Sequence, residues 1–252
     1  MTTLERSVTA LTLGASCLLG SALPAPADDP PPAENPGWVG SIGAGLALTS
    51  GNTDTKTFNF GGSATSDTKK RNVLKMDGLY LRTATDGETT VNRSTLGFRD
   101  EYGLGKHSFV FGEIRYLRDE FKDIKYLVSP LVGVGYKLVD QEKAVFSVDA
   151  AVGAAFEEPE AGDSTNSGAY HVGESFVWKL TPNATFSEGA TGLWKTNDSS
   201  DALYHFEASL SASVSKRFEL KLGFTDDYKN KPTAATLKKN DTALLANVVY
   251  KF

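Results

Sequence analysis

Hydrophobic residues recur at every second position from Trp38 to the C-terminus. In the last segment, residues 241–252, one parity is apolar or aromatic; it comprises Thr242, Leu244, Ala246, Val248, Tyr250 and Phe252. The intervening residues are polar, charged or small. Alternate side chains of a β-strand point to opposite faces, whereas a helix repeats its apolar residues every three or four positions. The segment is therefore predicted to be a strand with one apolar and one polar face.

The same alternation recurs in a series of runs upstream of this segment. They lie at residues 38–48, 58–64, 74–80, 96–102, 110–116, 126–136, 146–156, 170–178, 184–194, 204–214 and 218–224. With the terminal segment they predict about twelve antiparallel strands in one all-β domain, residues 38–252. Strands of ~10 residues with short connections and one apolar face are typical of a closed transmembrane β-barrel.

Aromatic residues and connection lengths add to this prediction. Tyr126 and Tyr136 bracket one run and Phe146 and Phe156 the next, where membrane–water interfaces favour amphipathic rings. The extracellular connections of such barrels are longer than the periplasmic ones. Longer polar connections are expected at 157–168, 196–201 and about 229–240, and shorter ones at 103–106, 140–143, 181–183 and 215–216.

The N-terminus has the features of an export signal. Arg6 precedes an uncharged run from Val8 to Leu23, and Ala25-Pro26-Ala27 is a signal-peptidase-like site, so residues 1–27 are predicted to be a signal peptide. A single transmembrane anchor is the alternative, but the run is shorter than the ~20 residues that span a bilayer. The prolines of residues 28–37 indicate an extended periplasmic tether. The one cysteine, Cys17, lies within the predicted signal.

Composition excludes some function classes. The chain of 252 residues has a formal net charge of -5, which argues against nucleic acid as a partner because phosphate binding requires a basic surface. Its mean hydropathy of -0.25 is too polar for a multi-pass helical membrane protein. A barrel with one apolar and one polar face averages to such a value.

Ionisable residues gather on the parity opposite to the apolar one and are predicted to line the lumen. The candidates are Lys75, Asp77, Arg93, Arg99, Glu101, Glu113, Arg115, Lys137, Asp149, His171, Lys179, Glu207, Glu219 and Lys221. They could form a mutually paired lumen that braces a small barrel, or the lining of a selective pore; their mixed signs argue against strong ion selectivity. Glu174 and Glu188 fall on the nominal outer face, through a register slip or a place near an interface.

Signals for catalysis, metals and cofactors are poor. The histidines His107, His171 and His205 have no metal-ligand spacing, and no Gly-x-Ser-x-Gly motif is present. No catalytic residue, metal or cofactor is therefore predicted. Acidic residues in 157–163 and 197–201 could meet divalent cations, although a solvated acidic loop is the simpler interpretation. Two alternatives stay open: a barrel-borne lipid hydrolase and a secreted soluble β-sandwich that binds a partner.

The C-terminus resembles the terminal signature of outer-membrane barrels, with Val248, Tyr250 and Phe252 at alternate positions. The resemblance implies that the barrel-assembly machinery reads this strand. Bacterial outer-membrane location, with outer-membrane lipids as further partners, follows as an expectation.

Several stretches resemble one family: residues 49–55, 109–121, 132–140 and 156–158. They are similar to the domain-of-unknown-function family 481, which includes proteins described as salt-induced outer membrane proteins. The resemblance extends over residues 38–252. It implies an outer-membrane β-barrel and supplies no substrate or catalytic residue. A structural or narrow small-solute and ion pore role, linked to salt or osmotic stress, is the resulting expectation.

Overall fold

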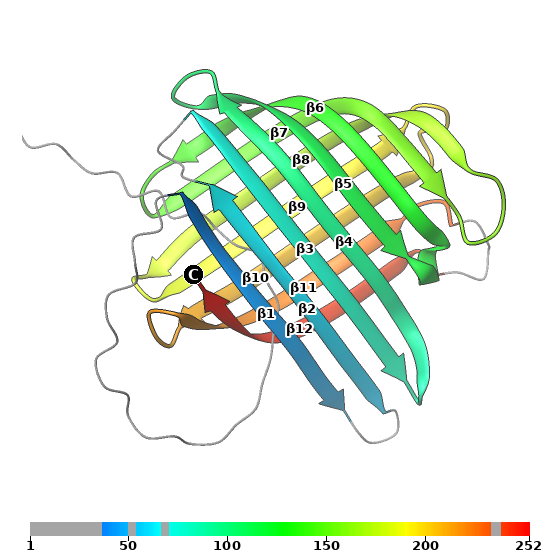
Figure 1. The fold of residues 1–252 in the computed structure, drawn as a ribbon, viewed down its shortest axis with the longest axis horizontal. Helices are drawn as coiled ribbons and strands as arrows, with labels where there is room; N and C mark the ends of the chain where they lie inside the picture. The colour runs from blue at the N-terminus through cyan, green and yellow to red at the C-terminus, as the bar shows by residue number, and fades with distance from the viewer. Residues whose placement is uncertain (1–36, 50–53, 67–70, 233–237) are drawn as a thin grey trace, which may run out of the picture.

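Twelve antiparallel strands close into a barrel in the computed structural model, which describes residues 37–49, 54–66, 71–232 and 238–252 (Figure 1). The predicted signal peptide and nearly all of the tether lie outside these residues. The strands are β1 (Trp38–Thr49), β2 (Thr55–Ser66), β3 (Asn72–Thr85), β4 (Glu88–Gly103), β5 (Ser108–Asp119), β6 (Ile124–Asp140), β7 (Ala144–Glu158), β8 (Thr165–Thr181), β9 (Ala184–Lys195), β10 (Ala202–Ser213), β11 (Phe218–Lys229) and β12 (Asn240–Lys251). The 3₁₀ turn η1 (Glu120–Lys122) joins β5 to β6. No helix in the described part of the chain is long and apolar enough to cross a membrane.

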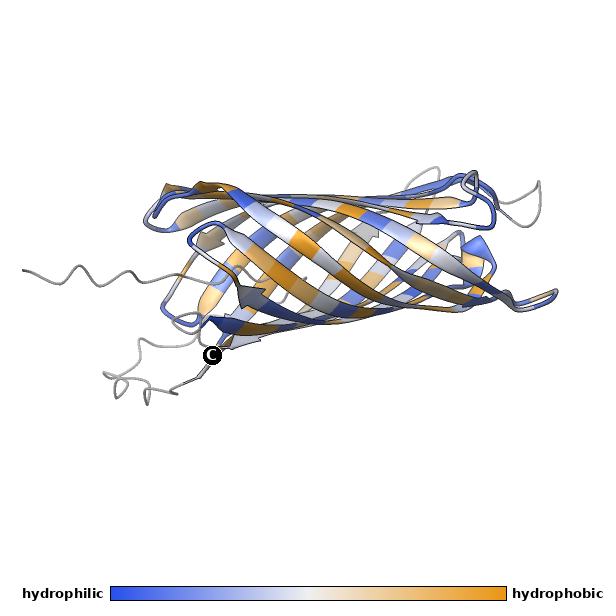
Figure 2. Ribbon diagram, turned by 90° about the horizontal axis from the view of Figure 1, so that it is seen from above, coloured by the Kyte–Doolittle hydropathy of each residue, from blue (hydrophilic) through white to orange (hydrophobic). Residues whose placement is uncertain are grey.

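The alternation of hydrophobic and polar residues along each strand gives the barrel wall two different faces. Outward-facing Ile114 and Val132 are 54% and 63% exposed, whereas inward-facing Glu113, the residue before Ile114, is only 4% exposed. Hydrophobic and hydrophilic residues alternate along the strands in Figure 2. The apolar side chains therefore face outward and the polar ones inward, which inverts the arrangement of a soluble protein. The soluble β-sandwich alternative is wrong.

The first and last strands close the ring. β1 pairs with β12 from Ser41↔Lys251 to Ala44↔Val248, and the backbones of Gly40 and Phe252 exchange two 3.0 Å hydrogen bonds. The Phe252 ring lies directly over Gly40, where an added Cβ would come within 2.5 Å of the ring. Closure removes the free sheet edges that lipid does not tolerate.

The connections lie at the two ends of the barrel. The termini end carries the start of β1 and the end of β12, and the opposite end, here called the loop end, carries the β1–β2, β3–β4, β5–β6, β7–β8, β9–β10 and β11–β12 connections (Figure 1). The long connection expected at 157–168 is shorter, because β7 continues to Glu158 and β8 begins at Thr165. The β3–β4 turn is tight: Asp86 and Gly87 both have positive φ, as in a type I′ hairpin.

Candidate functional site: the charged lumen

The barrel interior holds the predicted lumen residues on eight strands. They lie on β3 (Lys75, Asp77), β4 (Arg93, Arg99, Glu101), β5 (Glu113, Arg115), β6 (Lys137), β7 (Asp149), β8 (His171, Lys179), β10 (Glu207) and β11 (Glu219, Lys221). All share the parity opposite to the exposed apolar residues. The structure collects some of them into a network and leaves others near the termini end.

A mid-barrel cluster surrounds Arg99. Its guanidinium donates hydrogen bonds to Glu101 at 2.8 Å and Glu113 at 3.0 Å, and to Asp149 of β7 at 2.8 Å. The remaining members are Lys75, which pairs with Glu101 at 2.7 Å; Arg115, which pairs with Glu113 at 2.9 Å and Asp77 at 3.5 Å; and His171, which lies 3.2 Å from Asp149. Charges taken out of water need such pairing, because an isolated buried ion is strongly disfavoured.

Apolar side chains narrow the lumen beside this cluster. Phe109 and Phe111 point inward and are buried, and the Arg99 guanidinium lies 3.5 Å from the centre of the Phe111 ring. Gly135 and Gly133 of β6 make room for these rings, since a Cβ at Gly135 would approach Phe109 to 2.1 Å. The rings limit the freedom of Arg99 and reduce the open cross-section.

A second group of charges, the loop-end cluster, lies nearer the loop end. Its centre is Glu157, whose carboxylate contacts Lys195 at 2.5 Å and Lys229 at 2.7 Å. These three side chains are only 5%, 5% and 1% exposed. The other members are Arg93, Asp119, Lys122, Asp201, His205, Asp227 and Asp241.

Several pairs in the loop-end cluster join strands that are not neighbours in the sheet. Arg93 of β4 pairs with Asp227 of β11, although β3, β2, β1 and β12 separate these strands. Lys122 of η1 contacts Asp241 of β12 at 2.7 Å and donates to the Lys239 carbonyl at 3.1 Å. Such partners can meet only inside the barrel, so these pairs cross the lumen.

Sequence reasoning missed most of the loop-end cluster. Arg93 was predicted, but Glu157 was assigned to an acidic external connection. That assignment is wrong, because β7 extends through Glu157, which pairs with Thr165 of β8. Glu157 has the same inward parity as Ala155, and this alternation indicated that the strand continues. The acidic, Pro- and Gly-containing composition of residues 157–163 instead favoured a loop.

The remaining predicted lumen residues have fewer partners. Lys137 lies 3.8 Å from Asp140, Glu207 lies 3.8 Å from His205, and Glu219 lies 3.2 Å from Lys251. Lys221 is buried opposite Asn247 of β12, and Lys179 lies near the end of β8. Apart from Glu207, which contacts His205 of the loop-end cluster, these side chains line the lumen without joining either cluster.

Several carboxylates face outward instead, among them Asp226 of β11, which shares the outward parity of Leu222 and Phe224. The β8–β9 register is regular from Ala169 to Lys179, so Glu174 and Glu188 lie on the outer wall with Phe176 and Trp178 rather than in a slipped register. Asp100 of β4 shares the outward parity of Phe98 and Tyr102.

The acidic connections at the loop end are paired with bases. Glu158 contacts Lys125 at 2.5 Å, Glu160 lies 3.7 Å from Arg118, and Asp198 pairs with Lys231. Hydrogen bonds from Lys231 and then Ser200 lower the pKa of Asp198 to about 2. Within the described ranges no group of three or more His, Cys, Asp or Glu residues could hold a metal ion.

The comparisons with known proteins give the chain a family. A family model described as "Protein of unknown function, DUF481" matches residues 42–252. The chain belongs to this family. It is 21% identical over 228 residues to the uncharacterized protein YdiY of Escherichia coli (strain K12), with 88% of this chain and 86% of YdiY covered.

Solved outer-membrane barrels are similar to this DUF481 protein only at the level of general architecture. The NanC porin matches with a TM-score of 0.48 and 10% identity, covering 84% of this chain and 96% of NanC. The COG4313 outer membrane channel from Pseudomonas putida F1 matches with a TM-score of 0.48 and 14% identity, covering 90% and 100%.

The location of the DUF481 protein follows from its own architecture. A closed antiparallel barrel with an apolar outer wall and a polar interior is the way in which β-strands cross the outer membrane. The protein is an outer-membrane β-barrel, and the family assignment agrees with the resemblance found in the sequence.

Proposed function

We propose that this DUF481 protein is a non-enzymatic, narrow channel for small polar solutes and ions. The observation that carries the proposal is the set of charged lumen side chains that keep exposed surface in the mid-barrel cluster: Lys75, Asp77 and Arg115 are 45%, 39% and 45% exposed. Mixed charges around a water-filled constriction admit small solutes with weak ion selectivity. Since buried ion pairs are screened little by salt, the constriction keeps its form as the external ionic strength changes.

The non-enzymatic part of the proposal rests on where the histidines lie. His171 contacts Asp149 and His205 contacts Asp227, so both are held in the lumen by acidic partners. His107 lies in the β4–β5 connection, with its ring 5.8 Å from that of Tyr136. A hydrolase acting on lipids would need a histidine beside a serine on the outer wall.

A closed structural barrel is the second candidate, and the density of cross-lumen pairs favours it. The two candidates differ in ion conductance, because a narrow channel conducts ions and a closed barrel does not. In planar bilayers we expect the purified protein to give small, stable conductance steps.

Removing the central charges of the loop-end cluster tests the constriction. In the variant E157Q/K195Q/K229Q we expect conductance to rise roughly twofold, because neutral side chains no longer hold one another across the lumen. The matched control is K125Q/E158Q, which removes an exposed ion pair at the same end and should conduct like the wild type. Absence of conductance in both the wild type and the triple variant would establish the structural barrel instead.

A further inference from the structure

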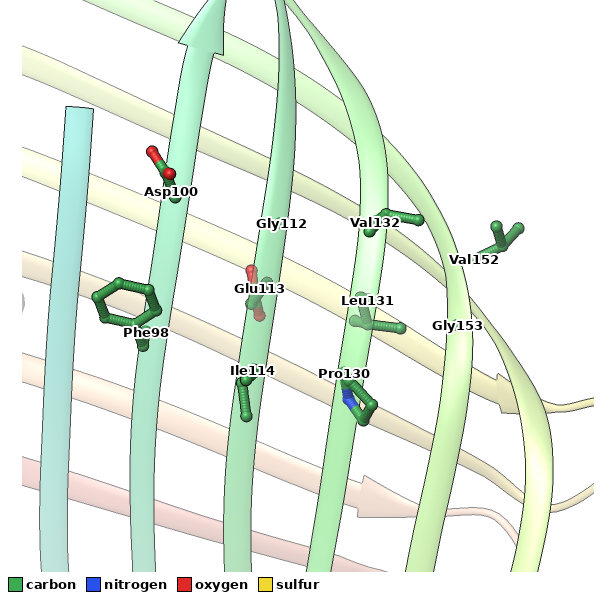
Figure 3. A pocket seen from close by; sticks show the side chains of 10 residues that line it. All are labelled: Phe98, Asp100, Gly112, Glu113, Ile114, Pro130, Leu131, Val132, Val152 and Gly153. Atoms are coloured by element: carbon green, nitrogen blue, oxygen red, sulfur yellow. The ribbon is translucent and has the colours of Figure 1, made fainter. Parts of the chain in front are cut away.

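A groove of about 390 Å³ crosses the outer wall over β4, β5, β6 and β7. Its floor is Gly112, where an added Cβ would meet nothing within 4 Å. Phe98 and Asp100 lie on one side of Gly112, and Val132 and Val152 on the other (Figure 3). The remaining lining is Glu113, Ile114, Pro130, Leu131 and Gly153. The groove has a volume within the range of small-molecule sites, ~300–1,000 Å³, and its outward-facing side chains other than Asp100 are apolar.

The carboxylate of Asp100 lies at the margin of this groove nearest the termini end (Figure 3). Its Oδ1 atom is buried and has no hydrogen-bond partner. Its cross-strand neighbours are Leu74 and Gly112, which supply no charge. No basic side chain in the part of the chain that the structure describes forms an ion pair with it.

An unpaired, charged carboxylate on a lipid-facing wall is unfavourable; it is stabilised either by taking up a proton or by a cation from outside the protein. Asp100 is three residues from Gly103, the last residue of β4, and two from Tyr102, which is 45% exposed. At ~3.3 Å per residue it lies roughly 10 Å along the strand from the end of the wall. We place the membrane–water interface at exposed Tyr102, because interfaces favour aromatic rings, and this puts Asp100 close to the lipid headgroups.

We propose that the groove binds a phospholipid with a primary ammonium headgroup. One acyl chain lies over Gly112 between the apolar side chains. The Asp100 side chain, whose Oδ1 atom is buried in the lipid-free protein, rotates toward the groove and accepts a hydrogen bond from the ammonium. A primary ammonium carries three N–H donors, as the lysine side chain does, whereas a quaternary choline headgroup carries none. An anionic headgroup would be repelled by the carboxylate. The chemistry therefore selects an ethanolamine-type lipid, whether or not the lumen conducts.

A second copy of the chain fits the groove less well. The outward-facing arginines in the described strands, Arg82 and Arg118, lie near the loop end and contact Thr89 and Glu160. Two copies inserted in the same direction hold their residues at the same depth. The arginines at the termini end, Arg71 and Arg217, lie in connections beyond the strands, so the described outer wall of a second copy presents no arginine at the depth of Asp100.

Native mass spectrometry of the full-length barrel tests the proposal. The protein is exchanged into micelles with equimolar phosphatidylethanolamine, phosphatidylcholine and phosphatidylglycerol that share the same acyl chains. We expect the ethanolamine lipid to be retained about tenfold over the choline lipid, the scale of one hydrogen bond to a charged group. D100N should abolish this preference, and G112L should lower the retention of all three lipids.

The control is E188Q, which removes an outer-wall carboxylate away from the groove and should keep the preference. Heat-modifiable gel mobility verifies that each variant is folded. If G112L does not fold, D100N alone decides the question. Equal retention of the three lipids by the wild type, or an unchanged preference in D100N, would overturn the proposal. Dimers without bound lipid would assign the groove to a second copy.

Discussion

The Glu157 carboxylate on β7 accepts a 2.7 Å hydrogen bond from Lys229 on β11, four strands away along the sheet. The contact joins two parts of the wall that share no backbone hydrogen bond. Its strength should appear in a double-mutant cycle of E157Q, K229M and the double variant. We expect a coupling free energy of about 2 kcal/mol, because removal of one partner leaves a buried charge poorly compensated.

Urea-induced unfolding in detergent, followed by tryptophan fluorescence, measures this coupling. The same cycle on Lys125 and Glu158, whose ion pair is exposed, should give a coupling near zero. Equal coupling in the two cycles would contradict the structural role given to Glu157.

The Arg99 guanidinium balances three carboxylates in the mid-barrel cluster. R99Q should shift the channel toward cation selectivity, because Glu101, Glu113 and Asp149 lose their common partner. The reversal potential across a KCl gradient measures the shift. R118Q, which changes an arginine outside the lumen, should leave the reversal potential at its wild-type value. No shift in R99Q would mean that ions do not pass this cluster.

The Asp198–Lys231 pair connects the β9–β10 and β11–β12 connections at the loop end. The pKa of Asp198 is about 2, below the ordinary value of about 4, because Lys231 and Ser200 donate hydrogen bonds to it. The contribution of this lowered pKa to folding is complete above the ordinary value and is lost as the pH falls through 2. K231Q should raise the Asp198 pKa toward its ordinary value. NMR titration of the carboxyl carbon measures both values, and an unchanged pKa in K231Q would remove Lys231 as the cause.

Phe252 has two roles that can be separated. We propose that it is read by the barrel-assembly machinery, and its ring also covers Gly40 across the β1–β12 seam. F252A should lower outer-membrane abundance in cells while the purified chain still refolds into detergent. G40V should impair both, because its side chain would collide with the ring. Equal abundance of F252A and wild type in cells would remove the proposed assembly role.

The parity of hydrophobic residues was enough to predict the barrel, its strand number and its outward face. Ends of strands were harder to predict, because Glu157 stands beside Glu158, Pro159 and Glu160 in a segment with loop-like composition. Pairing across the lumen depends on strand tilt and on the order around the ring. Nothing local in the sequence indicates that Arg93 faces Asp227. The outer groove likewise depends on the folded wall, in which Gly112 lies between the larger side chains of Asp100 and Val132 on the neighbouring strands.

The seam has a consequence for how the closed ring can open. Its register pairs run from Ser41 to Ala44, whereas β1 pairs with β2 from Trp38 to Thr49. The circumference is therefore held least firmly between β1 and β12. When the barrel unfolds, these two strands are therefore expected to separate first, so the stability of the closed ring depends most on the short β1–β12 register.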